Sequence, residues 1–381
     1  MDEEIAATLG TWRRHLHARP ELSTEERETA AFVAARLVEL GIPFVTGVGG
    51  HGVVATLARA GSGRSVALRA DMDALPIPEE TNLAHASTRP GVMHACGHDG
   101  HTASLLGAAQ LLARDATWRG TIRLIFQPAE EGGGGARAML ADGLIERFPF
   151  ERIFAFHNWP GLEAGTVMLH SGPVMAAGQR FAVTLHGKAG HAALPHLAKD
   201  PMVAAGHLLL ALQSIVSRNV SPLDAAVVTV GMIEAGNAPN QIPETAILRG
   251  TFRSYRDEVH ALIAAAIRRI ADGIAATFAM TSEVAMQTMG AATINTREDA
   301  DLAAAAAVAA GLVVRRDLLP SMTGEDFAWY LQEKPGAFAW IGNGPSEDGR
   351  DLHSPHYDFN DAILPAAATF LASAARAALA E

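Results

Sequence analysis

The stretch MHACGHDGHTA, residues 93–103, concentrates side chains that bind metals. It holds three histidines, one aspartate and Cys96, which is the only cysteine in the chain. A thiolate and imidazoles are suitable ligands for zinc and its first-row neighbours. Gly97 separates Cys96 from His98, so we expect an irregular loop to present both side chains to one ion. The alternatives are a nucleophilic Cys–His pair and an inert buried thiol.

The stretch FQPAEEGGGGA, residues 126–136, favours a hydrolytic metal centre over those alternatives. Adjacent carboxylates such as Glu130 and Glu131 can divide the work, because one binds a metal while the other takes a proton from water. A solvated surface pair is another interpretation, but the apolar LIFQPA before it places the pair where a buried strand emerges. A cysteine nucleophile needs no such pair of carboxylates.

Three apolar runs that are typical of strands carry acidic residues or a histidine at their ends. SVALRADMD ends in Asp71 and Asp73, TIRLIFQP leads to the two glutamates, and RIFAFHN contains His157. Helical patterns separate the runs, which predicts a mostly parallel sheet with helices on both faces. In open α/β sheets the functional site lies at the carboxyl ends of the strands. We therefore expect these side chains to meet at one edge of the sheet.

The length of 381 residues predicts two domains. Between residues 178 and 288 the strand and helix patterns follow the order βαββαβ, the ferredoxin-like split unit. We expect this segment to be an inserted lid and dimerisation domain that divides the catalytic domain into residues 1–177 and 289–381. Exposed edges of the lid predict a homodimer, with a homotetramer as the alternative. Helices are expected over 3–18 and 24–40, the second capped by Ser23 or Thr24, and from about Thr102.

Composition narrows the class of protein. Apolar residues make up 49% and charged residues 19% of the chain, as is typical of a globular protein. The net charge of −11 argues against nucleic acid as a partner. The N-terminus has no apolar signal segment, the apolar runs are short for a membrane span, and one cysteine forms no intrachain disulfide. We expect a cytoplasmic protein with no membrane partner.

Eight motifs, in order, resemble the amidohydrolase branch of the dinuclear aminoacylase/carboxypeptidase metallopeptidases, which includes hippurate hydrolases, N-acyl-amino-acid amidohydrolases and auxin-conjugate hydrolases. The motifs are LRADMDALPI, MHACGHDGHTA, FQPAEEGGGGA, FHNWPGLEAGTV, GKAGHAALPH, GNAPNQIP, MTGEDFAWY and LHSPHYDFND. The resemblance implies two divalent metal ions per subunit, and zinc, manganese, cobalt and nickel all remain candidates. It implies that Glu130 is the general base and that Asp73 orients a ligand. The implied metal ligands are Cys96, His98, Glu131, His157 and His353.

The chain departs from the wider family at one ligand motif. The wider family has a His-x-Asp pair, whereas this sequence has Asp71 and Asp73 with the Cys/His loop instead, as is typical of the amidohydrolase branch. The resemblance also implies that His191, Asn240 and Arg253 of the lid contact the substrate. An arginine suits a substrate carboxylate because it forms a bidentate pair. Ordinary surface roles remain the alternative for His191 and Arg253.

The function that these residues predict is hydrolysis of N-acyl-L-amino acids, hippurate-like or N-acetylated, to a carboxylic acid and a free amino acid. Two ions would bind a shared water and lower its pKa, and Glu130 would take its proton and later protonate the leaving nitrogen. The alternatives are an N-acetyl-diaminopimelate deacetylase, a small-peptide metallopeptidase, a cysteine-nucleophile hydrolase, and a scaffold that has lost its chemistry. The complete ligand set argues against the scaffold. The acyl group and the amino acid stay open.

Overall fold

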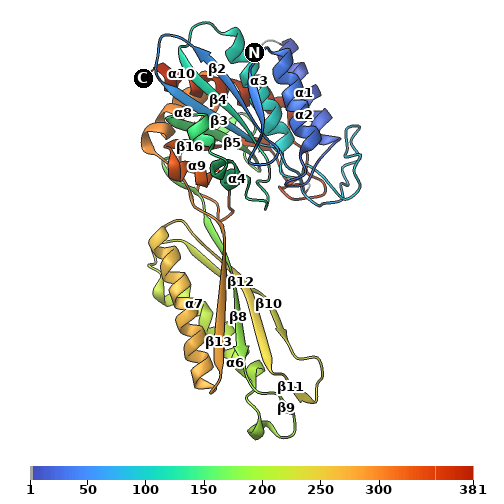
Figure 1. The fold of residues 1–381 in the computed structure, drawn as a ribbon, viewed down its shortest axis with the longest axis vertical. Helices are drawn as coiled ribbons and strands as arrows, with labels where there is room; N and C mark the ends of the chain where they lie inside the picture. Colours follow the sequence, from blue (N-terminus) through green and yellow to red (C-terminus); the bar gives the residue numbers. More distant parts are fainter. Residues whose placement is uncertain (1–2, 348, 381) are drawn as a thin grey trace. The chain divides into compact units, whose positions relative to one another are not determined.

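The protein divides into two compact units in a computed structural model that describes residues 3–347 and 349–380 (Figure 1). The first unit takes in the chain up to Val174, then Ile294–Leu319 and the chain from Asp326 on. The second unit consists of Met175–Thr293 and Pro320–Glu325. The segment from 178 to 288 that the sequence sets apart therefore lies inside the second unit.

A mostly parallel sheet of eight strands forms the centre of the first unit. Its strands are β1 (Phe44–Val48), β2 (Gly52–Arg59), β3 (Ser65–Asp71), β4 (Gly120–Gln127), β5 (Arg152–Pro160), β6 (Thr166–Met168), β15 (Val313–Arg315) and β16 (Gly336–Gly344). Their order is β1-β2-β4-β3-β5-β16-β6-β15, and the central neighbours β4, β3, β5 and β16 run parallel. Strand β3 is buried along nearly its whole length, as expected for a parallel strand covered on both faces.

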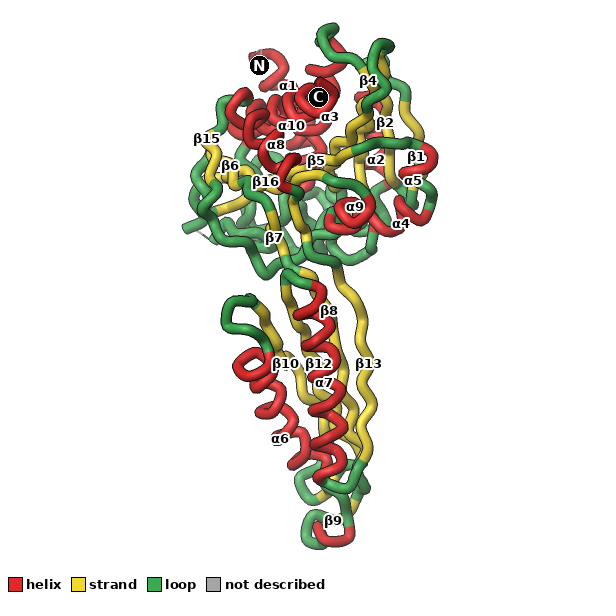
Figure 2. The backbone as a smooth tube through the Cα atoms, turned by 90° about the vertical axis from the view of Figure 1, so that its left-hand side faces the viewer, coloured by secondary structure: helices red, strands yellow, loops and turns green. Residues whose placement is uncertain are grey.

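Helices cover both faces of this sheet, which confirms the predicted α/β class. They are α1 (Glu3–His17), α2 (Arg27–Glu39), α3 (His98–Arg114), α4 (Gly135–Ala141), α5 (Leu144–Arg147), α8 (Arg297–Ala309), α9 (Ala328–Glu333) and α10 (Leu364–Ala380), with a 3₁₀ turn η3 (Asp361–Ile363). The long helices α3, α8 and α10 lie on one side of the sheet, and the short helices α4 and α9 lie on the other (Figure 2). The main apolar core fills the space between the sheet and the long helices.

Among the residues that the structure describes, one stretch is long and apolar enough to cross a membrane by length and composition alone. It is Asp361–Ala380, and 67% of its apolar window is buried inside the protein. Because α10 packs against the sheet and α3, we interpret this stretch as the central core helix.

The start of α2 differs from the prediction. The helix begins at Arg27, not near Ser23 or Thr24. Thr24 has a φ of 73°, which no helix contains, and the Ser23 hydroxyl donates to Asp73 Oδ2 at 2.6 Å. The two residues expected to cap the helix therefore belong to a loop that holds a strand-end carboxylate.

The second unit has the predicted ferredoxin-like order βαββαβ. Its elements are β8 (Ala177–His186), α6 (Pro201–Ser214) with a π-helical end η2 (Ile215–Asn219), β10 (Ala226–Ala235), β12 (Thr245–Ser254), α7 (Asp257–Thr277) and β13 (Thr281–Gly290). The strands form an antiparallel sheet in the order β10-β12-β8-β13. Phe181, Val183 and Leu185 alternate along β8 and pack with α6 and α7 in a separate core. This alternation is the period-two pattern of a strand with one covered face.

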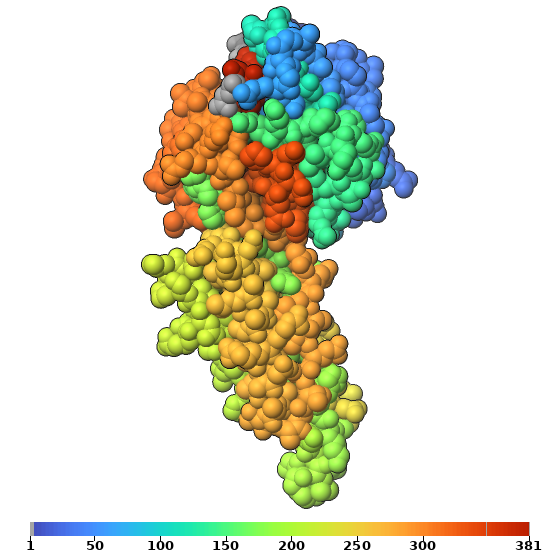
Figure 3. All heavy atoms as spheres, turned by 60° about the vertical axis from the view of Figure 1, so that its left-hand side comes forward, coloured from blue at the N-terminus to red at the C-terminus, as the bar shows by residue number. Residues whose placement is uncertain are grey.

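Smaller strands complete the structure. β9 (Gly190–His191) pairs with β11 (Gln241–Ile242) beside a 3₁₀ turn η1 (Pro195–Leu197), and β7 (Gly172–Met175) pairs with β14 (Thr293–Asn295). The segment from 188 to 199 forms a protruding tip of the second unit, seen as yellow-green atoms in the space-filling view (Figure 3). Its residues 191–197 are exposed throughout.

Candidate metal centre

The carboxyl ends of β3, β4 and β5 bring metal-binding side chains together, as the sequence predicted for parallel strands. Asp71, the last residue of β3, lies opposite Gln127, the last residue of β4. The ligand atoms within each of three groups lie within 4.8 Å of one another. These groups are Cys96 with His98 and His157, Cys96 with Glu131 and His353, and His98 with Glu130 and Glu131. All five residues that the resemblance implied as ligands are therefore neighbours, and Cys96 belongs to two of the groups.

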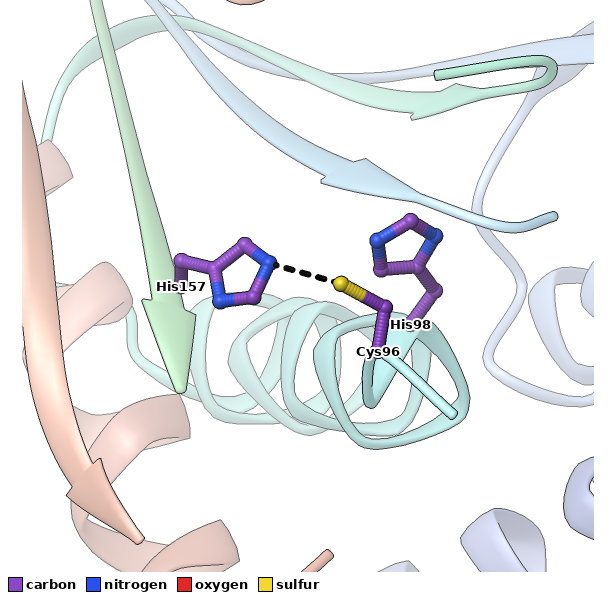
Figure 4. Close-up of side chains that lie close together, drawn as sticks. All are labelled: Cys96, His98 and His157. Carbon is purple, nitrogen blue, oxygen red and sulfur yellow. Dashed lines mark hydrogen bonds between the residues drawn. The ribbon is translucent and has the colours of Figure 1, made fainter. Parts of the chain in front are cut away.

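A sharp turn at Gly97 places Cys96 and His98 in this cluster. Gly97 has a φ of 88°, and α3 begins immediately afterwards at His98 rather than near Thr102 as predicted. Cys96 Sγ lies 3.4 Å from His157 Nε2, and Figure 4 shows both side chains pointing toward the space beside His98. The left-handed turn, which glycine adopts without strain, explains why the helix starts four residues early.

Hydrogen bonds set the ring orientation of both buried histidines. His98 Nδ1 lies 2.9 Å from the backbone oxygen of Asp73 and 3.2 Å from Asp73 Oδ1. His157 Nδ1 lies 2.6 Å from the backbone oxygen of Asn158. Because these partners only accept, each Nδ1 carries the proton and each Nε2 keeps its lone pair for a metal. His98 Nε2 has no hydrogen-bond partner among the described residues.

The electrostatics of the cluster fit a divalent cation. Burial, reinforced by the carboxylate of Glu131, raises the pKa of the Cys96 thiol well above its usual range, so a thiolate needs a positive charge beside it. Glu131 Oε1 lies 3.2 Å from His353 Nε2, but it makes no hydrogen bond of good geometry among the described residues. Thiol, imidazole and carboxylate donors with orphaned, buried lone pairs are the set that zinc, manganese, cobalt or nickel binds.

Asp71 has a different role from the cluster beside it. Its carboxylate accepts from His101 Nδ1 at 2.6 Å and from Arg69 Nη1 at 2.7 Å. Burial would raise the pKa of Asp71, but His98, His101 and Arg69 outweigh it and hold the pKa well below its usual value. His101 Nε2 accepts the backbone N–H of Asn158 at 3.0 Å, so both nitrogens of this ring are used inside the protein.

Glu130 and Glu131 reach the same space although they are neighbours in the chain. On a regular strand their side chains would point to opposite faces. Ala129, however, has a φ of 56° and turns the chain where β4 has ended. Its backbone N–H donates to Glu26 Oε1 at 2.7 Å, and the backbone N–H of Asp326 donates to Glu130 Oε1 at 3.3 Å. The turn therefore holds both carboxylates beside His98.

Several polar residues that support the cluster could not be identified from the sequence. They are Ser23, Glu26, Arg69, Asn158, Asp326 and Tyr357. Asn158 directly follows the ligand candidate His157 within β5, and Tyr357 lies in the same motif as His353. For Asn158 and Tyr357 this position was the only signal available, because the two residues that bond each other lie 199 residues apart in the sequence.

The three lid residues are not gathered at one place in the second unit. β9 pairs with β11, which brings His191 next to Gln241 and close to Asn240. Arg253 pairs with Gly178 at the other end of β12. Its guanidinium is half-buried and has no hydrogen bond or ion pair within the described part of the chain, and burial lowers its pKa. Strand β8 runs eight residues from Gly178, opposite Arg253, to His186, which is roughly 25 Å at ~3.3 Å per residue, and His191 follows this far end.

Replacing Cys96 by serine tests whether the thiol binds metal. An alcohol is a poor substitute for a thiolate ligand, so we expect Cys96→Ser to weaken metal binding by at least ~100-fold. The metal-free variant should unfold within ~2 kcal/mol of metal-free wild-type protein, because one buried polar atom replaces another. Competition with a chelator measures the first quantity, and thermal unfolding measures the second. Unchanged metal stoichiometry and affinity would show that Cys96 is not a ligand.

Comparisons with known proteins agree with this chemistry. A family described as Peptidase family M20/M25/M40 matches residues 67–377. N-acetyl-L-cysteine deacetylase of Bacillus subtilis (strain 168) is 43% identical over 365 residues, covering 96% of this chain and 86% of that protein. Hippurate hydrolase of Campylobacter jejuni is 40% identical over 367 residues, covering 95% and 94%. The Bacillus subtilis YXEP structure, a dinuclear metal-binding peptidase from the M20 family, has a TM-score of 0.89 at 36% identity, covering 100% and 99%.

Proposed function

The chain belongs to peptidase family M20/M25/M40 and is a metal-dependent amidohydrolase, and we propose that it hydrolyses the amide bond of N-acyl-L-amino acids. The observation that carries this proposal is the convergence of Cys96, His98, Glu131, His157 and His353 beside Glu130. A scaffold without chemistry has no need for this set, and a cysteine nucleophile has no need for two carboxylates next to its thiol.

We assign two divalent ions to this set, because Cys96 belongs to two overlapping groups of ligand atoms. When bound, such ions polarise a carbonyl oxygen and lower the pKa of water. Glu130 accepts a proton from the attacking water and returns it to the leaving nitrogen. Asp73 holds the His98 ring by its Nδ1 proton and so keeps Nε2 directed into the cluster. The native metal is one of zinc, manganese, cobalt and nickel.

The substrate class follows from the chemistry at Arg253 and from the relatives. A half-buried guanidinium without an internal partner suits the carboxylate of an amino acid, which it binds by two parallel hydrogen bonds. The named relatives act on N-acetyl-L-cysteine and on hippurate, which are both N-acyl amino acids. An N-acetyl-diaminopimelate deacetylase and a small-peptide metallopeptidase are the alternatives within the same chemistry.

A panel of substrates tests this proposal and uses Arg253 as the probe. We expect the metal-loaded enzyme to hydrolyse N-acetyl-L-amino acids or N-benzoylglycine faster than N-acetyl-diaminopimelate or dipeptides. Arg253→Ala should raise KM by roughly 10–100-fold, as the loss of charge-assisted hydrogen bonds predicts. Arg249→Ala, on the same strand but paired with Glu234, is the matched control and should leave KM unchanged.

The amide derivative of the best substrate shows whether Arg253→Ala loses carboxylate binding or is impaired in general. With N-acylamino acid amides, which lack the carboxylate, wild type and Arg253→Ala should have equal kcat/KM. No turnover of any N-acyl amino acid by metal-loaded enzyme would contradict the proposed function, and dipeptides as the best substrates would favour the metallopeptidase.

The separation of the lid residues supports a homodimer. His191 and Arg253 lie farther apart within one unit than an N-acyl amino acid can span. If both contact the substrate, one of them comes from a second copy. Edge strand β10 carries Met232 and Ile233, which are 55% and 49% exposed, and offers a surface for pairing.

We expect light scattering at micromolar concentration to give a dimer, or a tetramer built from dimers. Mixing Glu130→Gln with His191→Ala under subunit exchange should restore activity, because one hybrid site then combines an intact Glu130 with an intact His191 of the other copy. A monomer, or a mixture as inactive as its components, would contradict this assignment.

A further inference from the structure

Asn158 occupies a central position among the ligand candidates. It follows His157 on β5, is fully buried, and uses its backbone and side chain for separate tasks. Its backbone oxygen accepts from His157 Nδ1 at 2.6 Å, and its side-chain Nδ2 donates to the backbone oxygen of Cys96 at 2.7 Å. Asn158 is therefore hydrogen-bonded to two ligand candidates, His157 and Cys96, which come from different parts of the chain.

Tyr357 and the Cys96 carbonyl bond the two ends of this amide. The Tyr357 hydroxyl donates to Asn158 Oδ1 at 2.7 Å, and both residues have no exposed surface. A flipped amide would turn its oxygen toward the Cys96 carbonyl, and because both are acceptors the bond to Cys96 would be lost. Tyr357 also lies in the loop that carries His353, whose backbone N–H donates to the Ala95 oxygen at 2.8 Å. The Cys96 loop is thus held by the two segments that carry His157 and His353.

The other side of Asn158 is anchored to the sheet. Its backbone N–H donates to His101 Nε2 at 3.0 Å, which requires the His101 proton to be on Nδ1. Asp71 accepts that proton at 2.6 Å and is itself held by Arg69. The buried Arg69–Asp71–His101 chain therefore ends at the backbone of Asn158, whose side-chain Nδ2 also lies 3.1 Å from His101 Nε2.

The space around Gly97 shows how closely Asn158 and Tyr357, together called the clamp, pack against the loop from Cys96 to His98. A Cβ at Gly97 would lie 2.3 Å from Asn158 Nδ2 and 2.3 Å from the Tyr357 hydroxyl oxygen. Both distances are too short for any side chain, and the φ of 88° disfavours one in any case. The side chains of Asn158 and Tyr357 are therefore packed directly against the backbone of Gly97.

We propose that Asn158 and Tyr357 are positioning residues that hold Cys96 and His157 in the geometry a metal requires. This inference rests on the metal centre proposed above. Asn158 bonds the backbone of Cys96 and the ring of His157, and Tyr357 bonds Asn158, so both residues act through the thiol and the imidazole. Removing residues that hydrogen-bond metal ligands lowers the affinity for the metal about 10–100-fold.

Tyr357→Phe is the variant that tests the clamp, because it removes one hydroxyl and keeps the ring. Tyr330→Phe is the matched control, since Tyr330 is equally buried in the same unit and its hydroxyl lies 3.5 Å from Met139 Sδ. Asn158→Asp is the second variant, which keeps the shape but removes the donor to the Cys96 oxygen. Thermal unfolding verifies that each variant is folded.

Two readouts other than activity are measured. The first is the thiolate-to-cobalt charge-transfer absorption of Co²⁺-loaded protein, together with the Co²⁺ affinity. The second is the alkylation rate of Cys96 by iodoacetamide in metal-free protein, which is unambiguous because the chain has one cysteine. We expect Tyr357→Phe and Asn158→Asp to shift the absorption, weaken Co²⁺ binding by ~10–100-fold and accelerate alkylation at least ~5-fold, as a freed loop predicts. Tyr330→Phe should match wild type in all three.

The two readouts separate this inference from the proposed metal centre. If wild-type protein binds Co²⁺ without thiolate absorption, Cys96 is not a ligand and the proposed centre is wrong, whatever the alkylation rates are. If wild type shows the absorption but Tyr357→Phe and Asn158→Asp behave as Tyr330→Phe does, the centre stands and the clamp is wrong. Faster alkylation with a shifted absorption in both clamp variants supports both.

Discussion

Glu130→Gln is expected to lower kcat by ~10²–10⁴-fold while the protein keeps its full metal content. Glutamine has the shape of glutamate and keeps a hydrogen-bonding oxygen, so the backbone N–H of Asp326 retains its partner. It cannot accept a proton from water, which is the task assigned to Glu130. Steady-state kinetics and elemental analysis of the same preparation measure the two quantities together.

Glu131→Gln is the neighbouring variant against which the first is compared. It replaces an anionic ligand by a neutral one, so it should lose metal first and rate as a consequence. Excess metal should restore part of the activity of Glu131→Gln and none of the activity of Glu130→Gln. The reverse pattern, with metal rescuing Glu130→Gln and a fully loaded but inactive Glu131→Gln, would exchange the two roles.

Removal of metal is the change with the next largest expected effect. Metal polarisation of the reacting groups contributes several kcal/mol, so dialysis against a chelator should lower activity by at least ~10³-fold. Added Mn²⁺, Zn²⁺, Co²⁺ or Ni²⁺ should restore it, and the ion that gives the highest rate identifies the best candidate for the native metal. Elemental analysis must accompany the assay.

Two controls distinguish metal dependence from a loss of fold. Mg²⁺, which prefers oxygen ligands, should not restore the activity of a site that contains a thiol and imidazoles. The metal-free protein should retain its far-ultraviolet circular dichroism, because the core of the first unit does not involve the ligands. Full activity in protein that elemental analysis shows to be metal-free would support the cysteine-nucleophile alternative.

The positions of the strand ends were predictable because parallel strands impose them. Asp71 and His157 lie in the last part of apolar runs and the two glutamates follow another, and the carboxyl ends of neighbouring parallel strands lie at one edge. The ferredoxin-like order of the second unit was predictable for a similar reason, since its period-two alternation and long amphipathic helix are local patterns. Assigning individual ligands needed the resemblance to a family, because spacing alone left a Cys–His nucleophile open.

The start of α3 and the residues that support the ligands were not predictable. Helix patterns place the start of α3 near Thr102, but the left-handed turn at Gly97 begins the helix at His98 and directs that ring into the cluster. Asn158 and Tyr357 are 199 residues apart in the sequence, and their hydrogen bond depends on tertiary structure alone. Ser23 looked like a helix cap because serine caps helices locally, whereas here it bonds a carboxylate 50 residues away.

Anomalous X-ray diffraction from crystals of metal-loaded protein would show directly whether two ions bind at the Cys96 cluster. Data collected on either side of the absorption edge of the bound metal locate each ion and identify its element. We expect two peaks within coordination distance of the five ligand residues, with Cys96 Sγ bonded to at least one ion and Glu130 bonded to neither. A peak-free cluster in an active crystal, or a peak held by Asp71 and His101 with Cys96 unbonded, would contradict it.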